Sequence, residues 1–210
     1  MSVASLFHRL RARLLGALAD FLARPVRPAS QPDVADTESL AHLLRPGDVL
    51  LTEGVSRASA IVRRVTRSPW AHVSMYVGPL EDGADPRCIV EADITAGVRA
   101  VPLSEFKGQR ARIVRPMGLD DGQRRRVAEW VVGRVGDPYD LAHAWALARW
   151  LLRLAPRPKA MAQDARRFIC STLLAQAFLL FGHPVAAADV RHVVPRDFET
   201  ASGFEVVKTA

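Results

Sequence analysis

Residues 168–181 carry the clearest hydrophobic pattern in the chain. Apolar residues recur there at the spacing of one helix face: Leu173, Leu174, Ala177, Phe178 and Phe181. Ser171 and Thr172 favour a helix start, and Gly182 with Pro184 ends the run. The pattern predicts a helix that carries Cys170 at or near its first turn.

Alternating apolar and polar residues predict strands elsewhere. Over 71–78, His72, Ser74 and Tyr76 fall on one face, and the intervening apolar residues fall on the other. Further strands are predicted directly after the Pro46-Gly47 turn, over 88–93, over 110–114, and at 206–207. Helices are predicted over 58–66, 120–135 and 141–154, of which the last is apolar almost all round and is expected to be buried or interfacial.

Residues 3–23 have the pattern of an amphipathic helix with arginines on its flanks. Such a helix can lie on an anionic membrane surface, or it can pack on its own domain or on a second subunit. The apolar run 14–19 is short and is followed by Asp20, which disfavours a signal peptide. Three prolines follow, so we divide the chain into a helix at 1–24, a linker at 25–38 and one folded domain at 39–210.

Composition narrows the possible functions. A chain of 210 residues with 49% hydrophobic content can form one sizeable core. Two cysteines, Cys88 and Cys170, provide neither a disulfide framework nor zinc-ligand spacing, so we expect no metal or cofactor. The net charge of +7 suggests an anionic partner, but no arginine run is interleaved with stacking aromatics, which disfavours nucleic acid.

The cysteine helix is the best candidate for chemistry. A thiol at a helix N-terminus is stabilised as thiolate by the helix dipole, although a lone cysteine on an apolar helix is more often a packing residue. A nucleophilic thiolate needs a base and a group that orients the base. His72 opens one predicted strand, Glu91 lies on the next, and His192 is kept as a reserve base.

Five motifs in order resemble one known family. They are Pro-Gly-Asp-Val-Leu-Leu at 46–51, Ala-His-Val-Ser-Met-Tyr-Val-Gly at 71–78, Val-Glu-Ala at 90–92, Gly-Asp-Pro-Tyr-Asp at 136–140 and Phe-Ile-Cys-Ser-Thr-Leu-Leu at 168–174. Over roughly residues 40–185 the chain is similar to the YaeF/YiiX-type permuted papain-like enzymes. These are a branch of the NlpC-like superfamily, related to the lecithin–retinol acyltransferases.

The resemblance implies an α+β, circularly permuted papain-like fold, in which an antiparallel sheet packs against the cysteine helix. It implies Cys170 as nucleophile, His72 as general base and acid, and Glu91 as the residue that orients the imidazole. Backbone N–H groups at the start of the cysteine helix are expected to hold the oxyanion. We also predict substrate contacts from Tyr139, Tyr76 and Ser171.

The leading hypothesis is a thiol hydrolase of an amide, ester or thioester bond that takes a small-molecule, peptide or lipid acyl substrate. A membrane-associated lipid acyltransferase or deacylase is the first alternative. A catalytically silent binding module that uses the same cleft is the second. Without a clear signal peptide, we expect a cytoplasmic protein that is peripheral at the inner membrane or free of it, with export left open.

Overall fold

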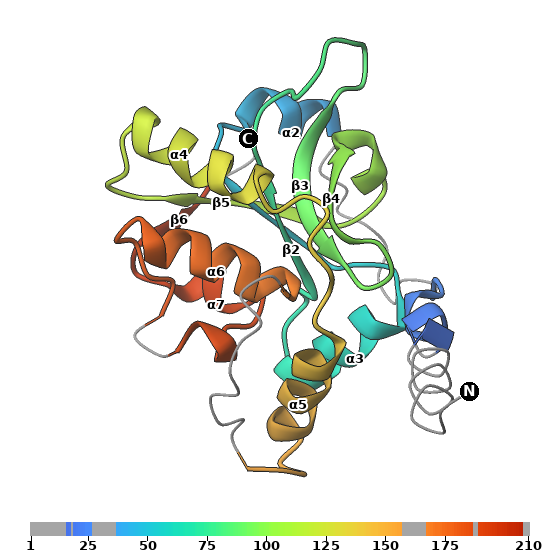
Figure 1. Ribbon diagram of the computed structural model, residues 1–210. Coiled ribbons are helices and arrows are strands. Elements are labelled where there is room, and N and C mark those ends of the chain that lie inside the picture. Colours follow the sequence, from blue (N-terminus) through green and yellow to red (C-terminus); the bar gives the residue numbers. More distant parts are fainter. Residues whose placement is uncertain (1–15, 18, 27–36, 157–166, 187–188, 208–210) are drawn as a thin grey trace, which may run out of the picture.

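The computed structural model describes residues 16–17, 19–26, 37–156, 167–186 and 189–207 (Figure 1). Six antiparallel strands form one sheet in the order β4-β3-β2-β1-β5-β6. The strands are β1 (Val49–Thr52), β2 (His72–Tyr76), β3 (Arg87–Asp93), β4 (Gly97–Pro102), β5 (Ala111–Pro116) and β6 (Phe204–Val206). All but β4 correspond to strands predicted from the sequence.

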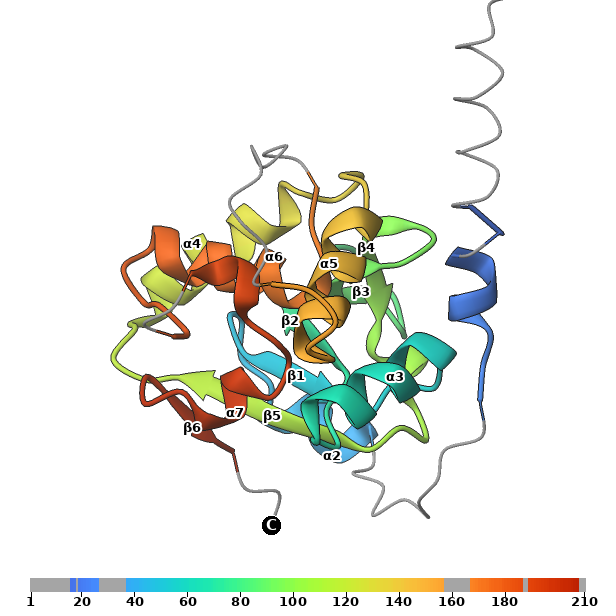
Figure 2. The ribbon, with the colours of Figure 1, turned by 90° about the horizontal axis from the view of Figure 1, so that it is seen from below.

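Helices cover both faces of the sheet (Figures 1 and 2). They are α2 (Thr37–Leu43), α3 (Arg57–Thr66), α4 (Asp121–Val132), α5 (Leu141–Leu151), α6 (Cys170–Leu180) and α7 (Asp197–Thr200), with short 3-10 helices η1 (Leu103–Phe106) and η2 (Val190–His192). The predicted α+β architecture, an antiparallel sheet packed against the cysteine helix, is confirmed. Ser39, the predicted first residue of the main domain, lies inside α2.

The alternation of the strands divides the core into two clusters. Val73 and Met75 of β2 face α6 and α4, whereas Leu50 of β1 and Ile89 of β3 face α2 and η1. Both faces of the central strands are therefore covered, so β1 is buried along its whole length. This double cover holds the first residue of β2, His72, at a fixed place beside the start of α6.

Helix α6 is the most deeply buried helix of the domain. Its residues from Cys170 to Ala175 are all buried, together with Ala177 and Phe178. The two polar side chains among them are satisfied internally: the Ser171 hydroxyl donates to the Val193 carbonyl over 2.6 Å, and the Thr172 hydroxyl accepts from the Ile169 N–H. The prediction that Cys170 lies at or near the first turn of the helix is confirmed, because Cys170 is the first residue of α6.

Strand β4 was not predicted from the sequence. The Gly-Asp-Pro-Tyr-Asp segment packs against its first residues: Val98 donates to the Asp137 carbonyl and accepts from Gly136, each over 2.8 Å. Two residues later, Tyr139 bridges to Phe168, next to the cysteine helix. This motif therefore joins the β3–β4 hairpin to the segment that leads into α6.

Gly97 permits this close contact. Its φ is +75°, and a Cβ placed on it would lie 2.5 Å from the Asp137 carbonyl oxygen. We predict that Gly97→Ala lowers the free energy of unfolding, measured by urea unfolding, by roughly 2 kcal/mol or more. The alanine would have to adopt a positive φ, and the backbone at Asp137 would have to move away from its Cβ. Gly108→Ala is the control: Gly108 has the same φ of +75° but no atom within 4 Å of the added Cβ. Equal losses in the two variants would contradict the role of the contact.

Helix α5 is more exposed than the sequence suggested. Leu147 is its one buried residue, and the Trp145 side chain is 64% exposed. Its apolar residues therefore do not all enter the core. Among the described helices, none has the length and hydropathy to cross a bilayer.

Most of the predicted N-terminal helix at 3–23, and residues 27–36 of the linker, lie outside the described residues. Within the described part, residues 19–23 are helical and Ala19 is buried. Val26 donates to the Val55 carbonyl, and Arg57 donates to the Arg24 carbonyl. This short segment is therefore attached to the start of α3.

Candidate active site

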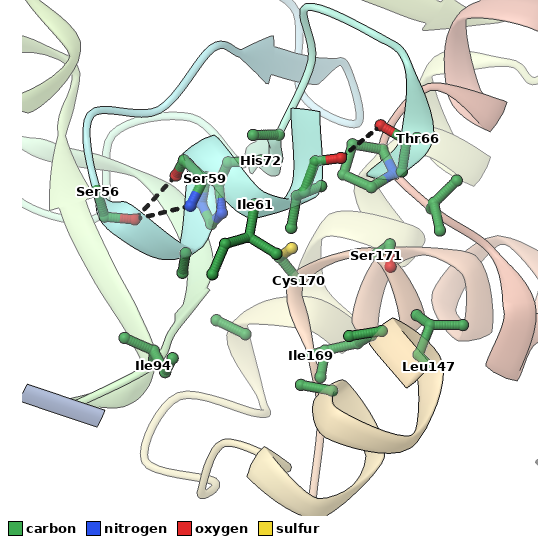
Figure 3. Close-up of a pocket in the computed structure, with 18 of the residues that line it drawn as sticks. Ser56, Ser59, Ile61, Thr66, His72, Ile94, Leu147, Ile169, Cys170 and Ser171 are labelled. Atoms are coloured by element: carbon green, nitrogen blue, oxygen red, sulfur yellow. Dashed lines mark hydrogen bonds between the residues drawn. The ribbon is translucent and has the colours of Figure 1, made fainter. Parts of the chain in front are cut away.

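The structure brings Cys170, His72 and Glu91 together from three elements. Ser74 lies directly opposite Glu91 in the β2–β3 pair, so His72, two residues earlier on the same face of β2, is the diagonal neighbour of that carboxylate. The His72 Nε2 lies 2.7 Å from the Glu91 Oε2. His72 and Cys170 line one pocket, of about 190 Å³ (Figure 3).

The surroundings of Cys170 favour its thiolate. Burial alone raises the pKa of the thiol, but the charge of His72 and a hydrogen bond with its ring lower it, and backbone N–H groups of Val73 and Ser171 lower it further. The net effect is a pKa below the ordinary value of a cysteine. Cys88, which is also buried, has its pKa raised, chiefly by burial.

The pKa values of His72 and Glu91 are shifted in the directions that favour their charged forms. Burial lowers the pKa of His72, but the negative charges of Cys170 and Glu91 and hydrogen bonds to both outweigh it, so the pKa lies well above the ordinary value. For Glu91, burial raises the pKa, and His72 and Arg99 reverse that shift to give a lowered value. The three groups therefore favour a thiolate, an imidazolium and a carboxylate in series.

Arg99 is a residue that reasoning from the sequence missed. On β4 it lies opposite Glu91, and its Nη2 and Nε donate to the Glu91 Oε1 over 2.6 and 3.0 Å. The Glu91 Oε2 is left to His72. Because Arg99 binds one oxygen and His72 the other, the arginine fixes the plane of the carboxylate that orients the imidazole.

We predict that Arg99→Gln lowers kcat/KM roughly tenfold through loss of this orientation, and that it leaves the protein folded. Arg87→Gln is the matched control, because Arg87 on β3 also forms a two-point pair with a carboxylate, that of the exposed Glu81, remote from Glu91. Steady-state kinetics of both variants test the role. An equal effect of the two substitutions, or none from Arg99→Gln, would contradict it.

Two of the three residues predicted to contact substrate lie at the pocket. Tyr139 lines the pocket, where burial, followed by the nearby charges of Cys170, Asp93 and Asp140, holds the pKa of its hydroxyl well above the ordinary value. Ser171 also lines it, but its hydroxyl is bound to the Val193 carbonyl. Its contribution to the site is its backbone N–H, which donates to the Cys170 sulfur.

Tyr76, the third residue predicted to contact substrate, does not line this pocket. Tyr76 shares a strand face with His72, but four residues of strand carry it about 13 Å away. There it packs against the cluster of Leu50 and Ile89, on the side of α2. The reserve base, His192, does not line the pocket either, and its ring packs edge-on against Trp150 at 5.1 Å.

The fold resembles a solved structure. The crystal structure of metalloprotein yiiX from Escherichia coli O157:H7 superposes with a TM-score of 0.58 and 18% sequence identity, over 79% of this chain and 97% of that one. At this identity the likeness shows the fold alone. No curated protein matches the chain.

The description as a metalloprotein belongs to yiiX. In the part of the chain that the structure describes, no group of three or more His, Cys, Asp or Glu side chains is placed to hold a metal ion. The two oxygens of Glu91 are bound to Arg99 and His72.

The chain also matches a protein family directly. Residues 43–151 match the permuted papain-like amidase enzymes YaeF/YiiX, the C92 family. The match covers just over half of the chain, from the end of α2 to the end of α5, and includes His72, Glu91 and Tyr139. Cys170 lies beyond the matched segment. The chain is a member of the permuted papain-like amidase family YaeF/YiiX.

Proposed function

We propose that this protein is a cysteine-dependent hydrolase that cleaves an amide or related acyl bond through an acyl-enzyme on Cys170. The observation that carries the proposal is the series Cys170, His72 and Glu91: Cys170 and His72 line one pocket, and Glu91 contacts His72 at 2.7 Å. The pKa of the thiol is lowered and that of the imidazole is raised, as a reactive ion pair requires. The family of permuted papain-like amidases supports the same class of reaction.

The first half of the reaction forms a thioester. The Cys170 Sγ attacks the acyl carbon, and the carbonyl electron pair moves onto its oxygen. As the tetrahedral intermediate collapses, His72 gives its proton to the leaving nitrogen or oxygen, and the amine or alcohol departs. Glu91 keeps the imidazole ring in place and stabilises its charged form before the transfer.

The second half consumes water. Neutral His72 takes a proton from a water molecule, whose oxygen attacks the thioester carbon. The carboxylic acid leaves, and the thiolate–imidazolium pair is restored. The first-turn N–H groups of α6, which have no acceptor within the helix, supply hydrogen bonds to the oxyanion in both halves.

Trapping the acyl-enzyme tests the proposal. The protein is mixed with p-nitrophenyl acetate and quenched in acid, and the intact mass is measured. We expect an added acetyl group on wild type, mapped to Cys170 and removed by neutral hydroxylamine, and none on Cys170→Ala. Acetylation that maps to other residues, or that persists in Cys170→Ala, would overturn the assignment of the nucleophile.

A further inference from the structure

The outer face of helix α5 carries large apolar side chains that the fold does not bury. Trp145 is 64% exposed and Leu152 is 49% exposed, and with Arg149 they have the i, i+4, i+7 spacing of one helix face. Leu147, on the other side of the helix, is buried. The outer face of α5 is therefore an exposed apolar stripe, separate from the face that lines the Cys170 pocket.

The turn that ends α5 adds another exposed apolar side chain, that of Leu154, which is 68% exposed. The Leu154 N–H donates to the Arg149 carbonyl, and the Arg153 N–H donates to the Trp150 carbonyl, each over 2.8 Å. Arg153 has a φ of +60°. This is a Schellman motif, so the backbone of Leu154 is held against the last turn of α5. We call the following side chains the α5 patch: Trp145, Arg149, Leu152, Arg153 and Leu154.

The charge along α5 and the residues after it is positive. Over 141–163 the sequence contains no Asp or Glu, and its basic residues are Arg149, Arg153, Arg157 and Lys159. Helix α3, which packs beside α5 (Figure 2), likewise contains three arginines and no carboxylate. Arg149 and Arg153 are both exposed, and neither pairs with a carboxylate in the part of the chain that the structure describes. The α5 patch thus combines exposed apolar side chains with an uncompensated positive charge.

This combination fits an anionic membrane surface better than a protein partner. Tryptophan concentrates at the lipid–water interface, leucine enters the acyl region beneath it, and arginine stays among the headgroups and attracts anionic lipids. A stable protein interface buries about 800 Å² on each partner. The α5 patch offers three large apolar side chains on a convex helix surface, which is small for such an interface. With 11 residues, α5 is too short to cross a bilayer and can only lie on it.

We propose that the α5 patch docks the protein on an anionic lipid bilayer. Trp145 and Leu154 enter the interface, and Arg149 and Arg153 lie among the headgroups. Docking does not depend on the proposed reaction, because none of these side chains lines the Cys170 pocket. Since another face of α5 does line that pocket, docking holds the candidate active site at the membrane surface.

The depth of Trp145 in the bilayer tests insertion directly. The full chain is mixed with vesicles of phosphatidylcholine and about one-third phosphatidylglycerol, with or without bromine on the acyl chains, and tryptophan emission is recorded. We expect brominated lipid to quench the emission of wild type but not of Trp145→Phe, which should still sediment with the vesicles. The other three tryptophans are more buried than Trp145, so they should contribute little to the quenching.

Sedimentation with the same vesicles measures the contribution of each side chain. Trp145→Gln together with Leu154→Gln should weaken binding about tenfold or more. Arg149→Gln should weaken binding to anionic vesicles about fivefold and leave any binding to pure phosphatidylcholine unchanged. Urea unfolding checks that each variant is folded.

Two substitutions away from α5 are the matched controls. Leu80→Gln changes an exposed leucine in the β2–β3 loop, at the opposite end of the molecule from α5 (Figure 1). Arg125→Gln changes an exposed arginine of α4. Both variants should bind the vesicles as wild type does.

The other outcomes would overturn the proposal. Vesicle binding that survives Trp145→Gln with Leu154→Gln, or an absence of quenching in wild type, would place any lipid binding outside α5. Equal binding to anionic and pure phosphatidylcholine vesicles would overturn the role of the arginines. Sedimentation velocity without lipid tests the remaining alternative: a dimer in wild type that becomes a monomer in Trp145→Gln would identify a second copy of the chain, rather than a membrane, as the partner.

Discussion

Replacing Cys170 with alanine is expected to lower kcat/KM for any substrate of this protein by roughly 10⁴-fold or more. The covalent route requires the sulfur, and removing a nucleophile that acts as one unit with its base removes most of the catalysis. The effect on folding should be small by comparison, because Cys170 is partly accessible from the pocket and the change deletes one sulfur atom. Steady-state kinetics, with urea unfolding as the check on stability, measure both.

Cys88→Ala is the matched control for this substitution. Cys88 is the other cysteine of the chain, is equally buried, and packs in the cluster of Leu50 and Ile89, away from the pocket. We expect its kcat/KM to stay within about threefold of wild type, with a loss of stability of about 1 kcal/mol from the lost packing. Retention of more than a tenth of the activity by Cys170→Ala would contradict the account.

Substituting Glu91 with glutamine is expected to lower kcat roughly 10²-fold or more and to narrow the pH profile from both sides. The loss in kcat follows because an amide cannot stabilise an imidazolium as a carboxylate does. The active form is the thiolate–imidazolium pair, so activity appears as the Cys170 thiol deprotonates and disappears as His72 deprotonates.

The direction of each shift follows from the charges. In wild type, Glu91 helps to raise the pKa of His72, so Glu91→Gln lowers that pKa and moves the alkaline limb to lower pH. The positive charge of the His72 imidazolium lowers the pKa of Cys170. In Glu91→Gln the imidazolium is less populated, so the pKa of the thiol rises and the acid limb moves to higher pH. The profile of kcat/KM against pH measures both limbs.

Glu105→Gln provides the comparison for the second prediction. Glu105 is the other carboxylate that binds Arg99, at 3.0 Å, and it does not contact His72. Glu105→Gln removes an ion pair of Arg99 but leaves the Glu91–His72 contact in place. The acid and alkaline limbs of the pH profile should therefore stay within about 0.3 pH units of those of wild type. If both limbs of the pH profile of Glu91→Gln coincide with those of wild type, the charge of Glu91 does not stabilise the thiolate–imidazolium pair.

The sequence predicted the elements whose pattern is local and strong. The 3.6-residue spacing placed α6 with Cys170 at or near its first turn, and the alternation over 71–78 placed His72 at the start of β2. Strand β4 escaped prediction because it begins at Gly97 and ends at Pro102, both poor strand residues. Its pairing with β3 compensates for these local preferences.

Features that depend on distant contacts could not be read from the chain. Arg99 acts on Glu91 only because the β3–β4 register places the two opposite each other. Tyr76 shares the strand face of His72, but distance along the strand, which alternation ignores, separates it from the pocket.

The measurement that tests the central claim most directly is the pH dependence of alkylation by iodoacetamide, resolved by mass spectrometry at Cys170 and Cys88 in the same sample. We predict that Cys170 in wild type reacts well below the pH at which a free thiol, with a pKa near 8.5, becomes reactive. Cys88, with its pKa raised, should stay unreactive, and His72→Ala should abolish the shift at Cys170. If Cys170 is inert at all pH values, or reacts alike in wild type and His72→Ala, the ion pair does not exist, and the protein is a binding module rather than a thiol hydrolase.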